Sequence, residues 1–163
     1  MPLDVLLMTA LSSERHFSDA GARLSMTIDP KLKETALFFK MDKAEVRQGL
    51  KIQTMLCCDG LIFYSRDNEQ DKVFCLVELK GNKLEHAVKQ IVTTRDYLQQ
   101  ALAQTLASSY LKRIRWKAYI YQHGSSQREQ IKLYRTQLEN VYGFDRGHTE
   151  ISRNSDIGDF LRK

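Results

Sequence analysis

The stretch that most constrains this chain is the apolar run from Val73 to Val77, which is followed by Glu78 and Lys80. Such a run of β-branched, aromatic and other apolar residues is typical of a strand that is buried on both faces of a sheet. Side chains alternate between the faces of a strand, so Glu78 and Lys80 are expected to point to the same side at its end. A surface ion pair, which contributes little stability, is the other explanation of the two charges.

A second carboxylate, Asp59, stands beside another β-rich run, Leu61 to Ser65. The dipeptide Asp59-Gly60 has two compatible interpretations. Asp-Gly favours a tight type I′ hairpin turn. Alternatively, Asp59 begins the strand as a functional carboxylate, and Gly60 lets the backbone come close to an ion or a substrate.

Asp59, a spacer that holds one strand and a turn, and then Glu78-x-Lys80 on the next strand resemble the PD-(D/E)xK nuclease superfamily. The resemblance covers roughly residues 42–140 and identifies no subfamily. It implies a restriction-endonuclease-like fold and a metal-dependent nuclease, with nucleic acid, expected to be DNA, as its partner. Asp59, Glu78 and the backbone carbonyl of Leu79 would bind Mg²⁺, for which Mn²⁺ would substitute.

The chemistry of phosphodiester hydrolysis explains why these residue types are needed. Carboxylate oxygens are the hard ligands that Mg²⁺ prefers, and the ion neutralises charge on the phosphate. A lysine beside them, here Lys80, would orient or deprotonate the attacking water and stabilise negative charge in the transition state. We therefore predict that Asp59, Glu78 and Lys80 are catalytic.

Two further polar residues are weaker catalytic candidates. Glu45 would supply the acid that many family members carry on the first helix, although an exposed partner of the helix N-cap explains it equally well. Gln90 resembles a glutamine that several branches carry on the helix after the ExK strand, and an ordinary polar helix flank is its alternative. Thr94 departs from the fuller pattern of those branches, in which a tyrosine follows the glutamine four residues later.

A basic strand is predicted from Arg113 to Tyr121, where polar and apolar residues alternate. Its basic and aromatic face would follow a phosphate backbone while tyrosines stack on bases, or it would simply be solvated. The residues that we expect to bind nucleic acid are Lys83, Arg113, Arg115 and Lys117.

The predicted fold is α/β (α+β), with a mixed sheet of about four strands flanked by helices in the order α-β-β-β-α-β-α. Residues 1–143 would form one domain, and the polar segment 144–163 would be a flexible or partner-docking tail. Asp29-Pro30 favours a short helix, although Leu37-Phe38-Phe39 fits a strand equally well. The other predicted elements are a helix at 42–49, strands at 50–58, 61–65, 73–80 and 113–121, and helices at 83–106 and 126–143.

Composition places the chain among ordinary globular proteins, with 42% hydrophobic residues, 28% charged residues and a formal charge of +5. The basic excess suits a polyanionic partner and is equally typical of a merely soluble surface. Its three cysteines, Cys57, Cys58 and Cys75, fall in apolar settings and are predicted to be reduced. The apolar stretch Leu3 to Leu11 is too short to span a membrane, so a cytoplasmic location is expected.

Two other functions fit the same residues. One is a catalytically silent subunit of this fold that holds nucleic acid or has a structural role in a larger complex. The other is a regulatory domain in which Glu78 and Lys80 form only a structural ion pair. A homodimer is also expected if both strands of a duplex are cut, because that reaction needs two active sites.

Overall fold

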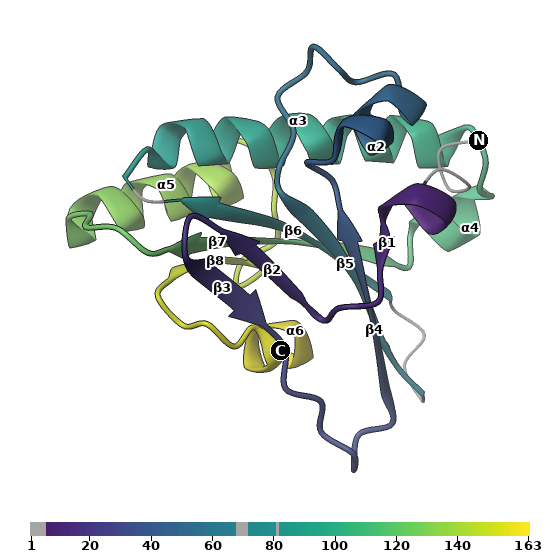
Figure 1. Cartoon of the computed structure of the whole chain (residues 1–163), viewed down its shortest axis with the longest axis horizontal. Helices are drawn as coiled ribbons and strands as arrows, with labels where there is room; N and C mark the ends of the chain where they lie inside the picture. The colour runs from purple at the N-terminus through teal and green to yellow at the C-terminus, as the bar shows by residue number, and fades with distance from the viewer. Residues whose placement is uncertain (1–5, 68–71, 81) are drawn as a thin grey trace.

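A six-stranded mixed sheet forms the centre of the molecule (Figure 1). The computed structural model describes residues 6–67, 72–80 and 82–163. In sheet order the strands are β1 (Leu11–Ser12), β4 (Glu34–Lys40), β5 (Gly60–Arg66), β6 (Lys72–Lys80), β7 (Ile114–Gln122) and β8 (Thr149–Ser152). Strands β4, β5 and β6 form an antiparallel meander, and β7 and β8 continue the sheet in parallel with β6.

Helices cover one face of the sheet, and a hairpin with a short helix covers the other (Figure 1). The first face carries α2 (Ala44–Gly49), α3 (Leu84–Ala103), α4 (Ser108–Leu111) and α5 (Arg128–Asn140). The second carries the hairpin of β2 (His16–Asp19) and β3 (Ala22–Ser25), together with α6 (Gly158–Arg162). A π-helical turn, η1 (Leu6–Ala10), precedes β1.

Strand β6 explains why the apolar run at 73–77 is almost continuous. Leu76 packs in the core under the helices, whereas Val73, Cys75 and Val77 pack under the hairpin and α6. Both faces of the strand are therefore buried, as predicted. Helix α3 also matches its prediction, because its apolar stripe is buried against the sheet: Leu84, Val88, Ile91, Leu98 and Leu102.

The first strand of the meander is β4, and the strand predicted at 50–58 is wrong. Residues 50–58 form the loop from α2 to β5, in which Lys51 has a positive φ of 59° and Leu56 is 41% exposed. Arg47 donates to the carbonyl groups of Gln53 and Met55, so these groups have a partner outside any sheet. Of the two readings of Leu37-Phe38-Phe39, the strand is confirmed and the helix is wrong.

No hairpin turn forms at Asp59-Gly60, because no strand precedes it. Asp59 instead leads into β5, and its carbonyl accepts a hydrogen bond from the amide of Met41 at 2.9 Å. Gly60 is required for a different reason from the one expected. A Cβ at Gly60 would lie 2.3 Å from the ring of Phe17 on the hairpin, so the glycine admits an aromatic side chain of the protein itself.

The segment 144–163 is not a flexible tail, because it folds onto the sheet. It supplies β8 and α6, and Ile151, Ile157, Phe160 and Leu161 are all buried. With β1, β4 and β8 counted, the sheet has six strands where about four were predicted. The predicted α/β class, with a mixed sheet flanked by helices, is confirmed.

Candidate active site

Asp59 and the end of β6 hold each other through hydrogen bonds. Gly60 pairs with Val77, so Asp59 at the start of β5 lies beside Glu78. The amide of Asp59 donates to Glu78 Oε2 at 3.1 Å, and the amide of Leu79 donates to Asp59 Oδ2 at 2.7 Å. The structure therefore brings together the two carboxylates that the sequence singles out.

Lys80 completes the cluster. Its Nζ lies 2.8 Å from Glu78 Oε1, and the Lys80 side chain is 25% exposed whereas the Glu78 side chain is fully buried. This is not the surface pair considered from the sequence, because its carboxylate is shielded from water. The ammonium group lies between a buried anion and the solvent.

The surroundings of both carboxylates disfavour their charged forms. Burial, together with the nearby charge of Asp59, raises the pKa of Glu78 to about 8, although Lys80 opposes the shift. Burial also raises the pKa of Asp59 to about 6, with further contributions from Asp42 and Asp19. One lysine therefore does not compensate the two carboxylates, and a cation bound between them would stabilise their charged forms.

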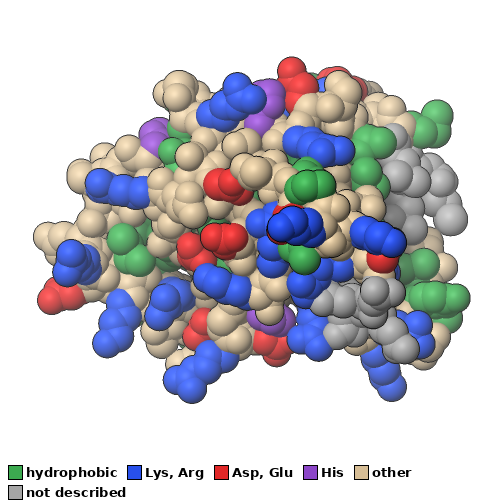
Figure 2. All heavy atoms as spheres, turned by 90° about the horizontal axis from the view of Figure 1, so that it is seen from below, with side chains coloured by type: hydrophobic (Ala, Val, Ile, Leu, Met, Phe, Trp, Pro, Cys, Tyr) green, Lys and Arg blue, Asp and Glu red, His purple; other side chains and the backbone are tan. Residues whose placement is uncertain are grey.

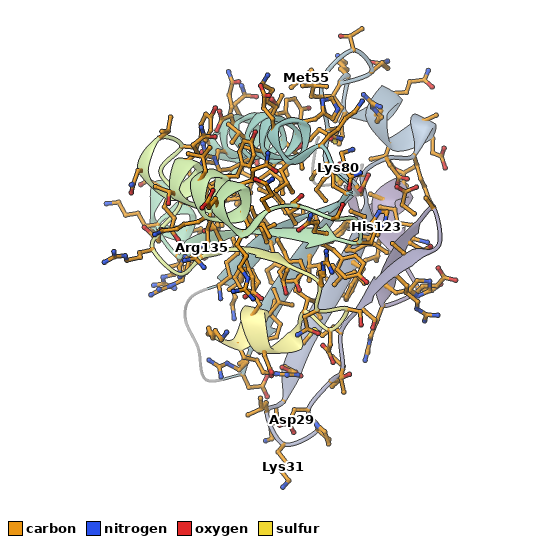
Figure 3. All side chains as sticks on the ribbon, turned by 90° about the vertical axis from the view of Figure 1, so that its left-hand side faces the viewer. Asp29, Lys31, Met55, Lys80, His123 and Arg135 are labelled. Atoms are coloured by element: carbon orange, nitrogen blue, oxygen red, sulfur yellow. The ribbon has the colours of Figure 1, made fainter. Side chains whose placement is uncertain are left out.

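A hollow of about 250 Å³ gives access to Asp59 and Leu79. Its other lining residues come from the hairpin, the end of β4 and the approach to α2: Phe17, Ser18, Asp19, Lys40, Asp42 and Lys43. Figure 3 is viewed toward the end of the sheet at which β6 ends, where Lys80 and His123 lie side by side. The amide of His123 donates to the carbonyl of Lys80 at 3.0 Å. Asp29 and Lys31 lie far from this end (Figure 3).

The backbone of Leu79 is oriented as a ligand role would require. In an extended strand the N–H and C=O of one residue point to the same side. Because the amide of Leu79 points to Asp59, its carbonyl points to the same edge of β6. The Leu79 carbonyl and the Asp59 carboxylate therefore lie at the same edge of β6.

Gln90 lies near the site and contacts neither carboxylate. Its side chain is 9% exposed, and Nε2 donates to the carbonyl of Cys57 at 2.9 Å. Its Oε1 is buried and has no hydrogen-bond partner within the described ranges. Gln90 is therefore buried and not on an exposed polar flank, and its contact is made to the segment that precedes Asp59, while its catalytic role stays a prediction.

Glu45 is exposed, and the hollow at Asp59 does not include it. The N-cap of α2 is Lys43, without a side-chain hydrogen bond, so the capping-box explanation of Glu45 is wrong, and its catalytic role stays a prediction. Asp42 and Asp19 are the additional acids at the hollow, and the sequence analysis missed them. Asp42 falls where β4 passes into α2, and Asp19 reaches the site only through the packing of the hairpin.

The four predicted nucleic-acid-binding residues separate into three locations. Lys83 is exposed just after β6 and lines a second hollow, of about 350 Å³, with Tyr134 of α5. Arg113 and Arg115 are exposed at the opposite end of the sheet, because Arg115 pairs with Val73 and Glu78 pairs with Ile120. At about 3.3 Å per residue, that places Arg115 about 17 Å from the level of Glu78.

Lys117 is a correction to the predicted basic face. It is 2% exposed beneath α6, and its Nζ donates to the carbonyls of Phe160 and Leu161 at 2.9 and 3.3 Å. The side chain points to the predicted face of β7, but α6 covers that face. Figure 2 shows basic and acidic side chains interspersed on the side seen from below, away from α3.

A scan of protein-family models, a search of curated proteins and a search of solved structures each found no match. Within the part of the chain that the structure describes, no group of three or more His, Cys, Asp or Glu side chains is arranged to hold a metal ion. No helix in those same residues is long and apolar enough to cross a bilayer.

Proposed function

We propose that this protein is a Mg²⁺-dependent nuclease of the PD-(D/E)xK type that hydrolyses phosphodiester bonds in nucleic acid, with DNA the expected substrate. The observation that carries the proposal is the reciprocal contact between Asp59 and the Glu78-Leu79 backbone, with Lys80 Nζ 2.8 Å from Glu78. Three residues that a short motif singled out converge at one end of one sheet. The raised pKa values of Asp59 and Glu78 are of the kind that cluster at functional sites.

The order of elements supports the restriction-endonuclease-like assignment in part. The meander β4-β5-β6, helix α3 and parallel strand β7 correspond to the β-β-β-α-β portion of the expected core. Helix α2 departs from that core, because it lies between the first two strands of the meander instead of ahead of them. Asp59, Glu78 and Lys80 themselves come from β6 and the residue that precedes β5.

The oxygen atoms at the site fit a hard divalent cation. Asp59, Glu78 and the carbonyl of Leu79 would bind it and water would complete its shell, because Mg²⁺ usually keeps several waters and few protein ligands. When bound, the ion would neutralise phosphate charge and lower the pKa of a bound water. Lys80 would orient that water and donate to a developing oxyanion.

A catalytically silent nucleic-acid-binding subunit is the second candidate. It is favoured by the ion pair that already engages Lys80, and by the absence of three metal-ligating side chains in one group among the described residues. A silent site would bind nucleic acid in a salt-dependent way without cutting it.

The deciding experiment is cleavage of duplex, single-stranded and branched DNA and of RNA, each with Mg²⁺, Mn²⁺ or EDTA. Asp59→Asn and Lys80→Met are compared with Glu129→Gln and Lys112→Met, which change similar charges at exposed positions that do not line the hollow. We expect metal-dependent cleavage that both site variants lose and both controls keep. Binding without cleavage would support the silent subunit, and cleavage that survives in both site variants would refute the proposed site.

A further inference from the structure

Helix α3 is connected by hydrogen bonds to the segment that enters β5. Gln90 Nε2 donates to the carbonyl of Cys57 at 2.9 Å, and the amide of Cys58 donates to Thr94 Oγ1 at 2.9 Å. The Thr94 hydroxyl in turn donates to the carbonyl of Gln90 at 2.7 Å. Gln90 and Thr94 are one helical turn apart and therefore lie on the same face of α3.

This connection acts where the sheet gives little support. Residues 50–58 are in no strand, so no ladder fixes the peptide groups of Cys57 and Cys58. Asp59 follows Cys58 directly, and its carboxylate must meet the amide of Leu79. The orientation of the Cys57-Cys58 peptide, which directly precedes the Cys58-Asp59 peptide, therefore depends on contacts from outside the sheet: Gln90 donates to its carbonyl and Thr94 accepts from its amide.

We propose that Thr94, together with Gln90, is a positioning residue that fixes Asp59 opposite Glu78 for metal binding. The proposal rests on the proposed nuclease function and deepens it. Thr94 is 2% exposed, and its hydroxyl contacts the amide of Cys58 and the carbonyl of Gln90. It therefore acts on Asp59 through the backbone of Cys58. Groups that orient metal ligands in this way often affect metal affinity as strongly as some ligands do.

An ordinary threonine in a helix offers a competing explanation. A threonine hydroxyl often donates to the carbonyl four residues earlier without any further role. Thr105 provides the matched control, because its hydroxyl contacts the carbonyls of Ala101 and Leu102 at the end of the same helix. Replacing Thr105 removes a hydrogen bond to the helix and leaves the Cys58 amide untouched.

The test compares Thr94→Val, Thr94→Ser and Thr105→Val with the natural chain in two measurements. The first is hydrogen exchange of the Cys58 amide without metal, and the second is titration with Mn²⁺ alone. In Thr94→Val we expect exchange about 10-fold faster or more and Mn²⁺ affinity about 10- to 100-fold weaker. Thr94→Ser should restore both values, and Thr105→Val should change neither.

The outcomes separate the inference from the function on which it rests. Faster Cys58 exchange with unchanged Mn²⁺ affinity in Thr94→Val would overturn the positioning role and leave the nuclease proposal standing. A natural chain that binds no Mn²⁺ would overturn the metal-dependent function, and the positioning role with it. If Thr94→Val does not fold, Gln90→Met removes the neighbouring hydrogen bond and takes its place in the Mn²⁺ titration, with the same expected loss of affinity.

Discussion

Glu78 and Glu34, two glutamates whose side chains are shielded from water, show opposite pKa shifts in the same fold. Both side chains are 0% exposed. Glu34 accepts hydrogen bonds from Arg162, the hydroxyl of Tyr64 and the amide of Asp29, and these outweigh its burial and lower its pKa to about 2. The pKa of Glu78, which has one lysine and a second carboxylate nearby, is raised to about 8.

The partners account for the difference, together with the position of Glu34 nearer the surface, because Glu34 as a whole residue is half-buried whereas Glu78 is fully buried. Glu34 has donors enough to stabilise its charge without any ligand, so the structure explains it as an element of stability. Glu78 has an unfavourable charge that a bound cation would stabilise, so its surroundings are better suited to binding than to stability.

The sharpest test of this comparison is Glu78→Gln. Under the proposed function we expect the cleavage rate to fall about 10³-fold, because the variant would lose a metal ligand and the partner of the lysine that would orient the attacking water. The melting temperature without metal should be unchanged or higher, because a neutral amide replaces a carboxylate that burial disfavours. Cleavage assays and calorimetry measure the two effects, and a large loss of metal-free stability would contradict the comparison.

The same substitution at Glu34 should lower the stability of the protein and leave cleavage unchanged. Glu34→Gln removes the closer of two carboxylate partners of Arg162, the other being Asp159 at 3.5 Å, and we expect the free energy of unfolding to fall by about 2 kcal/mol. Cleavage per folded molecule should stay the same, because Glu34 pairs with Arg66 at the opposite end of β5 from Asp59. Urea unfolding measures the change in the free energy of unfolding. A variant as stable as the natural chain would show that Glu34 does not contribute to stability in the way proposed.

Acid titration should separate the natural chain from Glu34→Gln. The pKa of Glu34 is about 2 in the folded protein, below its ordinary value of 4.5. The unfolded chain therefore binds more protons in this range, so the stabilisation is present above about pH 4.5 and is lost as the pH falls toward 2. The two unfolding free energies should converge by about 3 kcal/mol over that window. Parallel curves would show that Glu34 does not carry the effect.

The smallest effect is expected at an exposed glutamate. Glu85 and Lys89 form an ion pair on the surface of α3, with nitrogen and oxygen 2.7 Å apart and side chains 66% and 54% exposed. Because water screens such a pair, Glu85→Gln should not measurably change the melting temperature at physiological salt. A clear decrease in the melting temperature would mean that burial does not distinguish Glu78 and Glu34 from this exposed glutamate.

The sequence predicted the parts of the site that depend on local pattern. The apolar run before Glu78 identified β6, and the periodic stripe of Leu84, Val88 and Ile91 identified α3. Period-2 alternation also placed Glu78 and Lys80 on one side of the strand, next to each other in the structure. Asp59 was identifiable because it adjoins the strand that pairs with β6.

What the sequence failed to predict depends on contacts between distant segments. Alternation at 50–58 imitates a strand, yet Arg47 holds that segment as a loop. The alternation in β7 correctly predicted the face to which Lys117 points. Nothing in the local sequence indicates that α6 covers that side chain. Asp19 reaches the hollow only because Phe17 of the same hairpin packs over Gly60.

The contact between Glu34 and Arg162 also has a consequence for synthesis of the chain on a ribosome. The two residues are 128 positions apart, so Glu34 is translated about 10 s before its arginine at ordinary elongation rates. During that interval the face of the sheet that α6 will cover, which includes Tyr119 and Cys75, lacks its final cover. The nascent chain would expose an aggregation-prone apolar surface at that stage, which is the type of surface that chaperones bind.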